Sequence, residues 1–236
     1  MLLQLGEAPE SMPSELGGYQ RWFEHAWDGP LRLVDGRPGM GVGKLPDPRD
    51  FAGIVVSGSP ATLASVATAP WIDAAAELVR RAHDVGTPLL GVCFGHQLIG
   101  HAFGGRVVAN PWGWEVGTRD VQLTDEGRRD PLFAGLPARL RVNLTHRDII
   151  DPASCPSGLR VLAHNDAAAL QAVAVGSHTW GVQFHPEVSA AIMRGYIDAR
   201  RPVLADRDCD ALHARSADCP DAVAILRNFR AMVLTS

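Results

Sequence analysis

The first half of the chain alternates short apolar runs with longer stretches in which apolar residues recur at helical spacing. This alternation is typical of parallel strands joined by crossover helices, and the continuous apolar character of the short runs indicates strands that are buried on both faces. The pattern predicts strands at residues 2–5, 31–34, 53–57 and 88–92. It predicts helices at residues 15–27 and 70–85.

The pattern changes near residue 106. Shorter strand-like segments separated by turn residues follow as far as residue 184, and we expect them to form an antiparallel extension of the same sheet. They are predicted at residues 116–123, 140–143, 159–163 and 170–175. Beyond residue 188 the pattern is helical, with a polar loop predicted at 206–221 and a last helix at 222–233. The predicted fold is α/β, with a mostly parallel central sheet, flanking helices and a small antiparallel extension.

Composition and charge narrow the classes of function. A chain of 236 residues can bury one large core, so residues 1–236 are predicted to form a single domain. The formal net charge is -4 and basic residues cluster no further than in pairs, which argues against nucleic-acid binding. No apolar run is long enough to span a membrane and no basic flank precedes one at the N-terminus, so we expect a cytoplasmic protein without membrane contact.

The cysteines and histidines do not form a metal-binding pattern. The four cysteines are Cys93, Cys155, Cys209 and Cys219, and none belongs to a CxxC pair, so the sequence offers neither a zinc ribbon nor a thioredoxin motif. We expect free thiols, with a Cys209–Cys219 disulfide as the alternative. His96 and His101 have no second ligand cluster and are expected to pack or to be solvated, although His96 could line a pocket. No metal and no cofactor are expected.

A predicted strand runs into Gly91-Val92-Cys93-Phe94-Gly95 and then into a short helix. This is the pattern of a nucleophile elbow with cysteine in place of serine, because the two glycines allow a sharp turn without side-chain clashes. A helix that begins after Cys93 favours the thiolate over the thiol. The Phe94 N–H is then a candidate donor to an oxyanion. The alternative is that Cys93 is a small buried residue in a turn.

A cysteine nucleophile requires a base and a group that orients the base. His185 follows a predicted strand that ends at Phe184, and Pro186 and Glu187 come directly after it. Glu187 is close enough in sequence to reach the imidazole. We therefore predict that Cys93, His185 and Glu187 act together.

The segments from Gly91 to Gln97 and from Gly181 to Glu187 resemble the two signature motifs of the class I (triad) glutamine amidotransferases. The resemblance implies a flavodoxin-like fold and the catalytic triad Cys93, His185 and Glu187. It also implies hydrolysis of the glutamine side-chain amide through a γ-glutamyl thioester, with release of ammonia and glutamate.

Further segments extend the resemblance. The segment from Ile54 to Pro60 is similar to the family's strand and turn that donate a second oxyanion N–H, which implies that Gly58, Ser59 and Phe94 form the oxyanion hole. The family often has a second glycine where this chain has Ser59. The alternative is a plain turn.

Residues 113–117 and 143–148 are similar to the glutaminase domain of GMP synthase and its stand-alone relatives. The similarity implies that Gln97, Thr145, His146 and Arg147 hold the amino-acid end of the substrate. Arg147 stands where the family usually has glycine, and an arginine there would narrow the pocket or bind a substrate carboxylate. This departure from the family's sequence leaves the identity of the substrate open.

Three functions remain open. In the first, a stand-alone amidotransferase passes ammonia to a separate synthetase, because one glutaminase-like domain occupies the whole chain. In the second, the same triad makes the chain a γ-glutamyl peptidase or hydrolase. In the third, a binding protein keeps the fold without turnover. A homo-oligomer is compatible with all three.

Residues 38–45 superficially resemble a phosphate-binding loop. Pro38 stands at the first required glycine, and Leu45 follows Lys44 where serine or threonine is required. We therefore predict a loop that binds no nucleotide.

Overall fold

The computed structural model describes residues 1–37, 45–64 and 69–235. Residues 38–44, which include most of the phosphate-loop-like sequence, lie outside the described residues. None of the helices formed by the described residues is long and apolar enough to cross a membrane.

The centre of the molecule is a nine-stranded sheet in the order β2-β1-β3-β4-β11-β10-β9-β6-β7. The first five strands pair in parallel, and their order is that of the flavodoxin-like doubly wound fold, in which ligands bind at the carboxyl ends of the strands. These strands are β1 (Leu2–Gln4), β2 (Leu33–Asp35), β3 (Ile54–Val56), β4 (Leu89–Val92) and β11 (Thr179–Val182).

The other four strands pair antiparallel and continue the same sheet, as the sequence predicts. They are β6 (Glu115–Leu123), β7 (Arg139–His146), β9 (Leu159–His164) and β10 (Ala172–Val175). A separate antiparallel pair consists of β5 (Val107–Ala109) and β8 (Asp148–Ile150). The α/β fold predicted from the sequence is confirmed.

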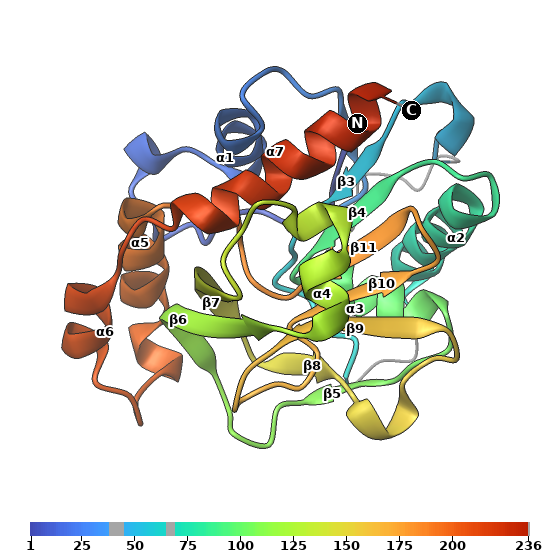
Figure 1. Cartoon of the computed structure of the whole chain (residues 1–236). Helices are drawn as coiled ribbons and strands as arrows, with labels where there is room; N and C mark the ends of the chain where they lie inside the picture. The colour runs from blue at the N-terminus through green and yellow to red at the C-terminus, as the bar shows by residue number, and fades with distance from the viewer. Residues whose placement is uncertain (38–44, 65–68, 236) are drawn as a thin grey trace.

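Helices cover both faces of the parallel strands (Figure 1). Successive strand residues point to opposite faces, so Leu2 packs in one core and Leu3 in the other. The first core includes buried residues of α1 (Tyr19–Trp27), α5 (Ala190–Arg200) and α7 (Pro220–Thr235). The second core includes those of α2 (Pro70–Asp84) and α3 (Phe94–Ala102).

The remaining helices are short. They are the α-helices α4 (Asp125–Arg129) and α6 (Cys209–Arg215) and the 3-10 helices Ser14–Leu16, Pro48–Asp50, Pro131–Phe133, Pro152–Ser154 and Arg201–Val203.

The structure corrects the sequence prediction at residues 15–27 and 206–221 in particular. The helix expected at residues 15–27 is interrupted, because Gly17 adopts a φ of +73° and separates a 3-10 turn from α1. The prediction of a loop at residues 206–221 is wrong, because this segment contains α6. The Asp208 side chain accepts a hydrogen bond from the Ala211 N–H and caps this helix, while Cys209 is buried in the first core.

Candidate active site

Cys93 lies in a sharp turn between β4 and α3, with φ of +54° and ψ of -102°. A positive φ is strained for a residue with a side chain, and among the described residues other than glycine only Asp28 shares it. A Cβ on Gly91 would lie 2.4 Å from the Gly95 carbonyl oxygen, and a Cβ on Gly95 would lie 2.5 Å from that of Val56. Both glycines are therefore needed for the turn.

His185 and Glu187 follow β11, the strand that pairs in parallel with β4. His185 Nδ1 lies 2.7 Å from Glu187 Oε1, and both side chains are buried. Asn143 of β7 fixes this segment, because its carbonyl accepts a hydrogen bond from the His185 N–H at 2.8 Å and its Nδ2 donates to the Val188 carbonyl at 2.8 Å. The antiparallel part of the sheet thus supports the histidine.

The charges around His185 favour its protonated form. Burial on its own lowers the pKa of His185, but the negative charges of Glu187 and Cys93 outweigh this effect and raise the pKa to about 10. A Cβ on Gly58 would lie 3.3 Å from His185 Cε1 and 3.7 Å from Cys93 Cβ, so the turn after β3 adjoins both side chains. The arrangement is suited to an imidazolium beside a thiolate.

A cavity of about 490 Å³ opens at Cys93. This volume is within the range of about 300–1,000 Å³ that is typical of pockets for small molecules. The predicted substrate-binding residues Gln97, Thr145, His146 and Arg147 all line the cavity, as does Ser59. The Thr145 hydroxyl is buried and has no hydrogen-bond partner among the described residues.

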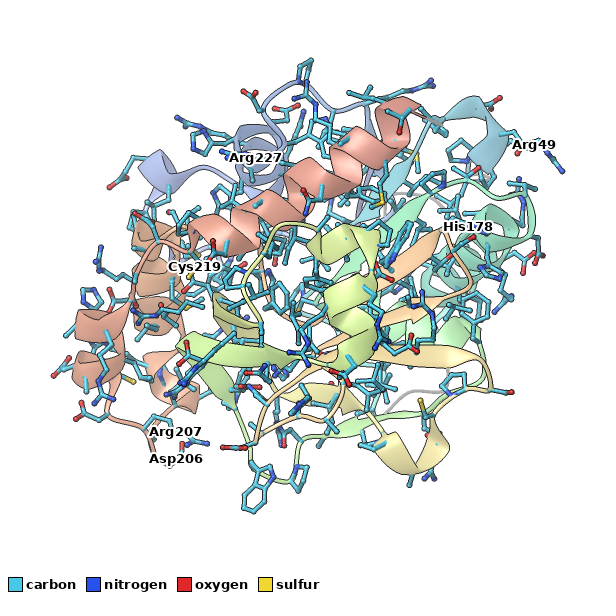
Figure 2. All side chains as sticks on the ribbon, in the orientation of Figure 1. Arg49, His178, Asp206, Arg207, Cys219 and Arg227 are labelled. Atoms are coloured by element: carbon cyan, nitrogen blue, oxygen red, sulfur yellow. The ribbon has the colours of Figure 1, made fainter. Side chains whose placement is uncertain are left out.

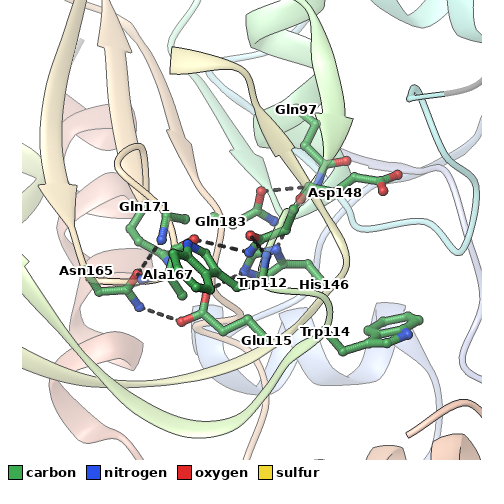
Figure 3. A network of polar contacts seen from close by, with 12 residues as sticks. Gln97, Trp112, Trp114, Glu115, His146, Asp148, Asn165, Ala167, Gln171 and Gln183 are labelled. Carbon is green, nitrogen blue, oxygen red and sulfur yellow. Dashed lines mark hydrogen bonds and ion pairs between the residues drawn. The ribbon is translucent and has the colours of Figure 1, made fainter. Parts of the chain in front are cut away.

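A buried polar network supports the cavity wall that contains His146 (Figure 3). Glu115 Oε2 accepts hydrogen bonds from His146 Nε2 at 2.9 Å and from Gln171 Nε2 at 2.8 Å, and Glu115 Oε1 accepts one from Asn165 Nδ2. Burial on its own raises the pKa of Glu115, but these hydrogen bonds and the positive charge of His146 lower it below its usual value. The Glu115 carboxylate therefore holds His146 in place.

Gln97 is held by the same wall. Its Nε2 donates to the Asp148 carbonyl at 2.8 Å and to Gln183 Oε1 at 3.1 Å, while His146 Nδ1 lies 3.1 Å from that carbonyl. The Gln97 amide nitrogen and both ring nitrogens of His146 are thus engaged with the protein itself. They fix the shape of the cavity rather than leaving all their donors free for a ligand.

His96 lies outside the cavity wall. It is fully buried under β11, where a Cβ on Gly181 would lie 2.8 Å from its Nδ1. Burial lowers the pKa of His96 to about 3, so the ring is neutral. The four cysteines are free thiols, and only Cys93 among them lines the cavity.

Two residues of the cavity wall carried no signal in the sequence analysis as ligand-binding groups. Arg200 is the last residue of α5, and Trp114 precedes β6. The Arg200 Cζ lies 4.7 Å from the centre of the Trp114 ring and 5.4 Å from that of Tyr196. No sequence motif joins these positions, and the packing of α5 against β6 brings them together.

Comparison with known proteins identifies the family. Residues 44–197 match the family model of the class I glutamine amidotransferases. The chain belongs to this family. A crystal structure of a glutamine amidotransferase from Thermotoga maritima has a similar fold, with a TM-score of 0.73 and 20% sequence identity over 98% of this chain and 97% of that chain.

Curated relatives include enzymes of two kinds. A glutamine-hydrolysing GMP synthase from Thermomicrobium roseum is 37% identical over 150 residues, which are 61% of this chain and 26% of that protein. One subunit of the glutamine-hydrolysing GMP synthase from Saccharolobus solfataricus is 41% identical over 109 residues, or 44% of this chain and 53% of the relative. The γ-glutamyl peptidase 5 of Arabidopsis thaliana is 28% identical over 177 residues, 73% of this chain and 66% of the peptidase. The matches thus span between about a quarter and two thirds of the relatives' lengths.

Proposed function

We propose that the chain hydrolyses γ-glutamyl amide bonds, with glutamine as one substrate, and that Cys93, His185 and Glu187 form its catalytic triad. The observation that carries this proposal is the strained turn at Cys93, which adjoins a buried His185–Glu187 pair at a cavity of small-molecule size. A strained backbone is costly to stability, and strained backbones and buried groups with strongly shifted pKa values are typical of active sites. We also propose that residues 1–236 act as a single glutaminase domain.

In the proposed reaction the Cys93 thiolate attacks the side-chain amide carbon of the substrate. Two backbone N–H groups stabilise the resulting oxyanion, and His185 donates its proton to the leaving nitrogen. Ammonia or an amine then departs, leaving a γ-glutamyl thioester. Next, His185 takes a proton from water that attacks the thioester, and glutamate is released. A pKa of His185 raised to about 10 suits the first of these roles, because the ring is protonated when the thiolate attacks.

The oxyanion donors are proposed to be the N–H groups of Phe94 and of the turn formed by Gly58 and Ser59. The Ser57 hydroxyl donates to the Gly58 carbonyl at 2.8 Å and accepts from the Leu5 N–H at 2.9 Å. In a trans peptide the next N–H points opposite to this carbonyl. The hydrogen bond therefore supports Ser59, which lines the cavity, as the donor in the turn.

A separate synthetase is a proposed partner. The relatives that are named as one subunit of GMP synthase support a division of labour in which one chain hydrolyses glutamine and another uses the ammonia. The relatives named γ-glutamyl peptidase support the second candidate, hydrolysis of γ-glutamyl peptides without an acceptor. Both candidates use the same triad.

The test is glutamate release by the purified chain from glutamine and, in parallel, from γ-glutamyl peptides. We expect the Cys93→Ala variant to lose at least about 10⁴-fold in rate, because a triad without its nucleophile retains only binding and oxyanion stabilisation. Cys155→Ala is the matched control, because Cys155 is an exposed thiol outside the cavity. A preference for glutamine supports the amidotransferase, and a preference for peptides supports the peptidase.

The covalent intermediate gives a second measurement. Mass spectrometry of the acid-quenched reaction should detect a γ-glutamyl adduct on the peptide that contains Cys93. If no substrate is cleaved and no adduct forms, even when the synthetase component of a GMP synthase is added, the triad proposal is refuted and a binding protein on this fold is favoured.

A further inference from the structure

Arg200 is a cation at the cavity without a carboxylate partner among the described residues. Its interactions there are with the faces of Trp114 and Tyr196, and its Nε is buried without a hydrogen bond. The neighbouring Arg201 behaves differently, because it is exposed and forms ion pairs with Asp198 at 3.0 Å and Asp210 at 2.8 Å. A guanidinium carries five N–H donors in a planar fork that matches a carboxylate. Arg200 therefore presents unused donors at a ligand-binding cavity.

The rest of the fold holds the backbone at Trp114 in place, and the Trp114 ring is partly buried against the first core. Arg207 Nη2 donates to the carbonyls of Trp112 at 2.9 Å and Trp114 at 3.2 Å, and Arg207 lies on the outer loop between α5 and α6 (Figure 2). On the other side, Glu115 is anchored in the buried network, and Figure 3 shows Trp114 pointing away from that network. The half-buried Trp114 ring thus supports Arg200 from an anchored backbone segment.

Arg200 lies on the His185 side of the cavity. Tyr196 connects the two, because its ring packs under Arg200 and its ring centre lies 6.3 Å from that of His185. The Tyr196 hydroxyl donates to the Tyr19 hydroxyl at 3.1 Å, which fixes the ring. Arg147 and Asp148 follow β7 and line another part of the same wall, where Gln97 binds the Asp148 carbonyl.

The proposed mechanism determines which part of a substrate lies near Arg200 and which part lies near Arg147 and Asp148. In the proposed mechanism His185 donates its proton to the leaving nitrogen, so the leaving group must face His185. A charged substituent on that leaving group then comes within reach of Arg200. The α-ammonium and α-carboxylate of the γ-glutamyl part carry opposite charges, and Asp148 and Arg147 offer the complementary pair.

We infer that Arg200, supported by Trp114, is a specificity-determining residue that binds a carboxylate on the leaving group. The substrates of this site are then γ-glutamyl amino acids and γ-glutamyl peptides with a free carboxylate beyond the scissile amide. Glutamine, whose leaving group is ammonia, uses the triad without this contact. The inference rests on the proposed function, since it takes the direction of the leaving group from His185.

The test compares γ-glutamylglycine with γ-glutamylglycinamide, which has almost the same size but no free carboxylate. The readout is the ratio of kcat/KM for the two substrates. We expect the wild-type chain to prefer the carboxylate, and Arg200→Met to lower the ratio by about tenfold to a hundredfold, as removal of a hydrogen bond between charged groups does. Arg201→Met is the matched control, and its ratio should equal that of the wild type.

Arg200→Lys keeps the positive charge and the apolar stem but lacks the planar fork. We expect a kcat/KM ratio between those of the wild type and Arg200→Met. If Arg200→Met does not fold, Arg200→Lys takes its place in the test. Equal loss of kcat/KM on both substrates would assign Arg200 a purely structural role and overturn the inference. A wild-type ratio near one would overturn it as well, while leaving the proposed triad intact.

Binding measurements distinguish failure of the proposed carboxylate subsite at Arg200 from failure of the proposed catalytic function. In the Cys93→Ala background, calorimetry should detect tighter binding of γ-glutamylglycine than of its amide, and Arg200→Met should abolish the difference. If this holds although the wild-type chain cleaves nothing, the subsite stands and the catalytic proposal fails. If neither compound binds, the subsite is refuted directly.

Discussion

The parallel and antiparallel parts of the sheet build the cavity in different ways. In the parallel part the key feature is the backbone, because two glycines permit the strained turn that presents Cys93 at the end of β4. In the antiparallel part the key feature is a set of buried polar side chains, in which Glu115 of β6 holds His146 of β7. The turn at Cys93 therefore depends on local backbone geometry, whereas the cavity wall and the placement of His185 against Asn143 depend on long-range contacts.

Apart from loss of the nucleophile itself, the largest effect is expected from Glu187→Gln, which acts on the parallel part. Loss of the carboxylate that orients His185 should reduce kcat by about 10³- to 10⁴-fold, as in other triads. The substitution should also lower the pKa of His185, since the charge of Glu187 helps to raise it to about 10.

The pH dependence follows from that raised pKa. The unfolded-state pKa of histidine is 6.5, so the stability that the imidazolium contributes is fully present below pH 6.5 and is lost as the pH rises through about 10. In Glu187→Gln this loss should occur at lower pH. Denaturant unfolding of both proteins, measured against pH, reports the change, and identical stability profiles would contradict the assignment.

A second change tests whether the turn at Cys93 requires its glycines. Gly91→Ala should destabilise the fold by about 3 kcal/mol, because the added Cβ meets backbone atoms that cannot move away. Gly18→Ala is the control, because no atom lies within 4 Å of its added Cβ, and it should cost under about 1 kcal/mol. Denaturant unfolding measures both, and equal stabilities would argue against a tightly packed turn.

A smaller effect is expected in the antiparallel part. Glu115→Gln keeps the shape of the side chain but removes the charge that His146 and Gln171 bind, which should cost about 2 kcal/mol of stability. KM should rise more than kcat falls, because the cavity wall shifts while the triad remains. A fall in kcat with unchanged KM would show that the two parts of the sheet do not divide their roles in this way.

The same variant has a pH signature of the opposite sign. The pKa of Glu115 is lowered in the fold, so its contribution to stability is present above its unfolded-state value of 4.5 and is lost as the pH falls through the lower, folded value. Glu115→Gln should therefore flatten the acid limb of the stability profile, as measured by thermal melting between pH 3 and pH 6.

The smallest effect is expected from Arg207→Ala, which removes two hydrogen bonds to the loop that carries Trp114. The support of Arg200 should loosen, and the preference for γ-glutamylglycine over its amide should fall by about two- to tenfold. Arg194→Ala is the matched control. Arg194 lies on the same helix as Arg200 and donates a hydrogen bond to the Ser216 carbonyl, but it does not line the cavity. An unchanged preference in Arg207→Ala would indicate that the Trp114 ring needs no support from this loop.

The sequence alone determined the features whose causes are local. Glycines two residues on either side of Cys93 predict the turn, because their steric requirement involves backbone only a few residues away. His185 and Glu187 lie two residues apart, so their contact follows from their spacing. The alternating pattern of apolar runs likewise predicted the parallel strands and the antiparallel extension.

Only the tertiary structure decided the contacts between distant segments. The stacking of Arg200 on Trp114 depends on how α5 docks on β6, and the bond between Glu115 and His146 depends on the register of β6 with β7. The polar segment before α7 forms the short helix α6, because Asp208 caps it and the core receives Cys209. These features depend on strand register and helix packing, which act between residues far apart in the chain, so no local pattern could reveal them.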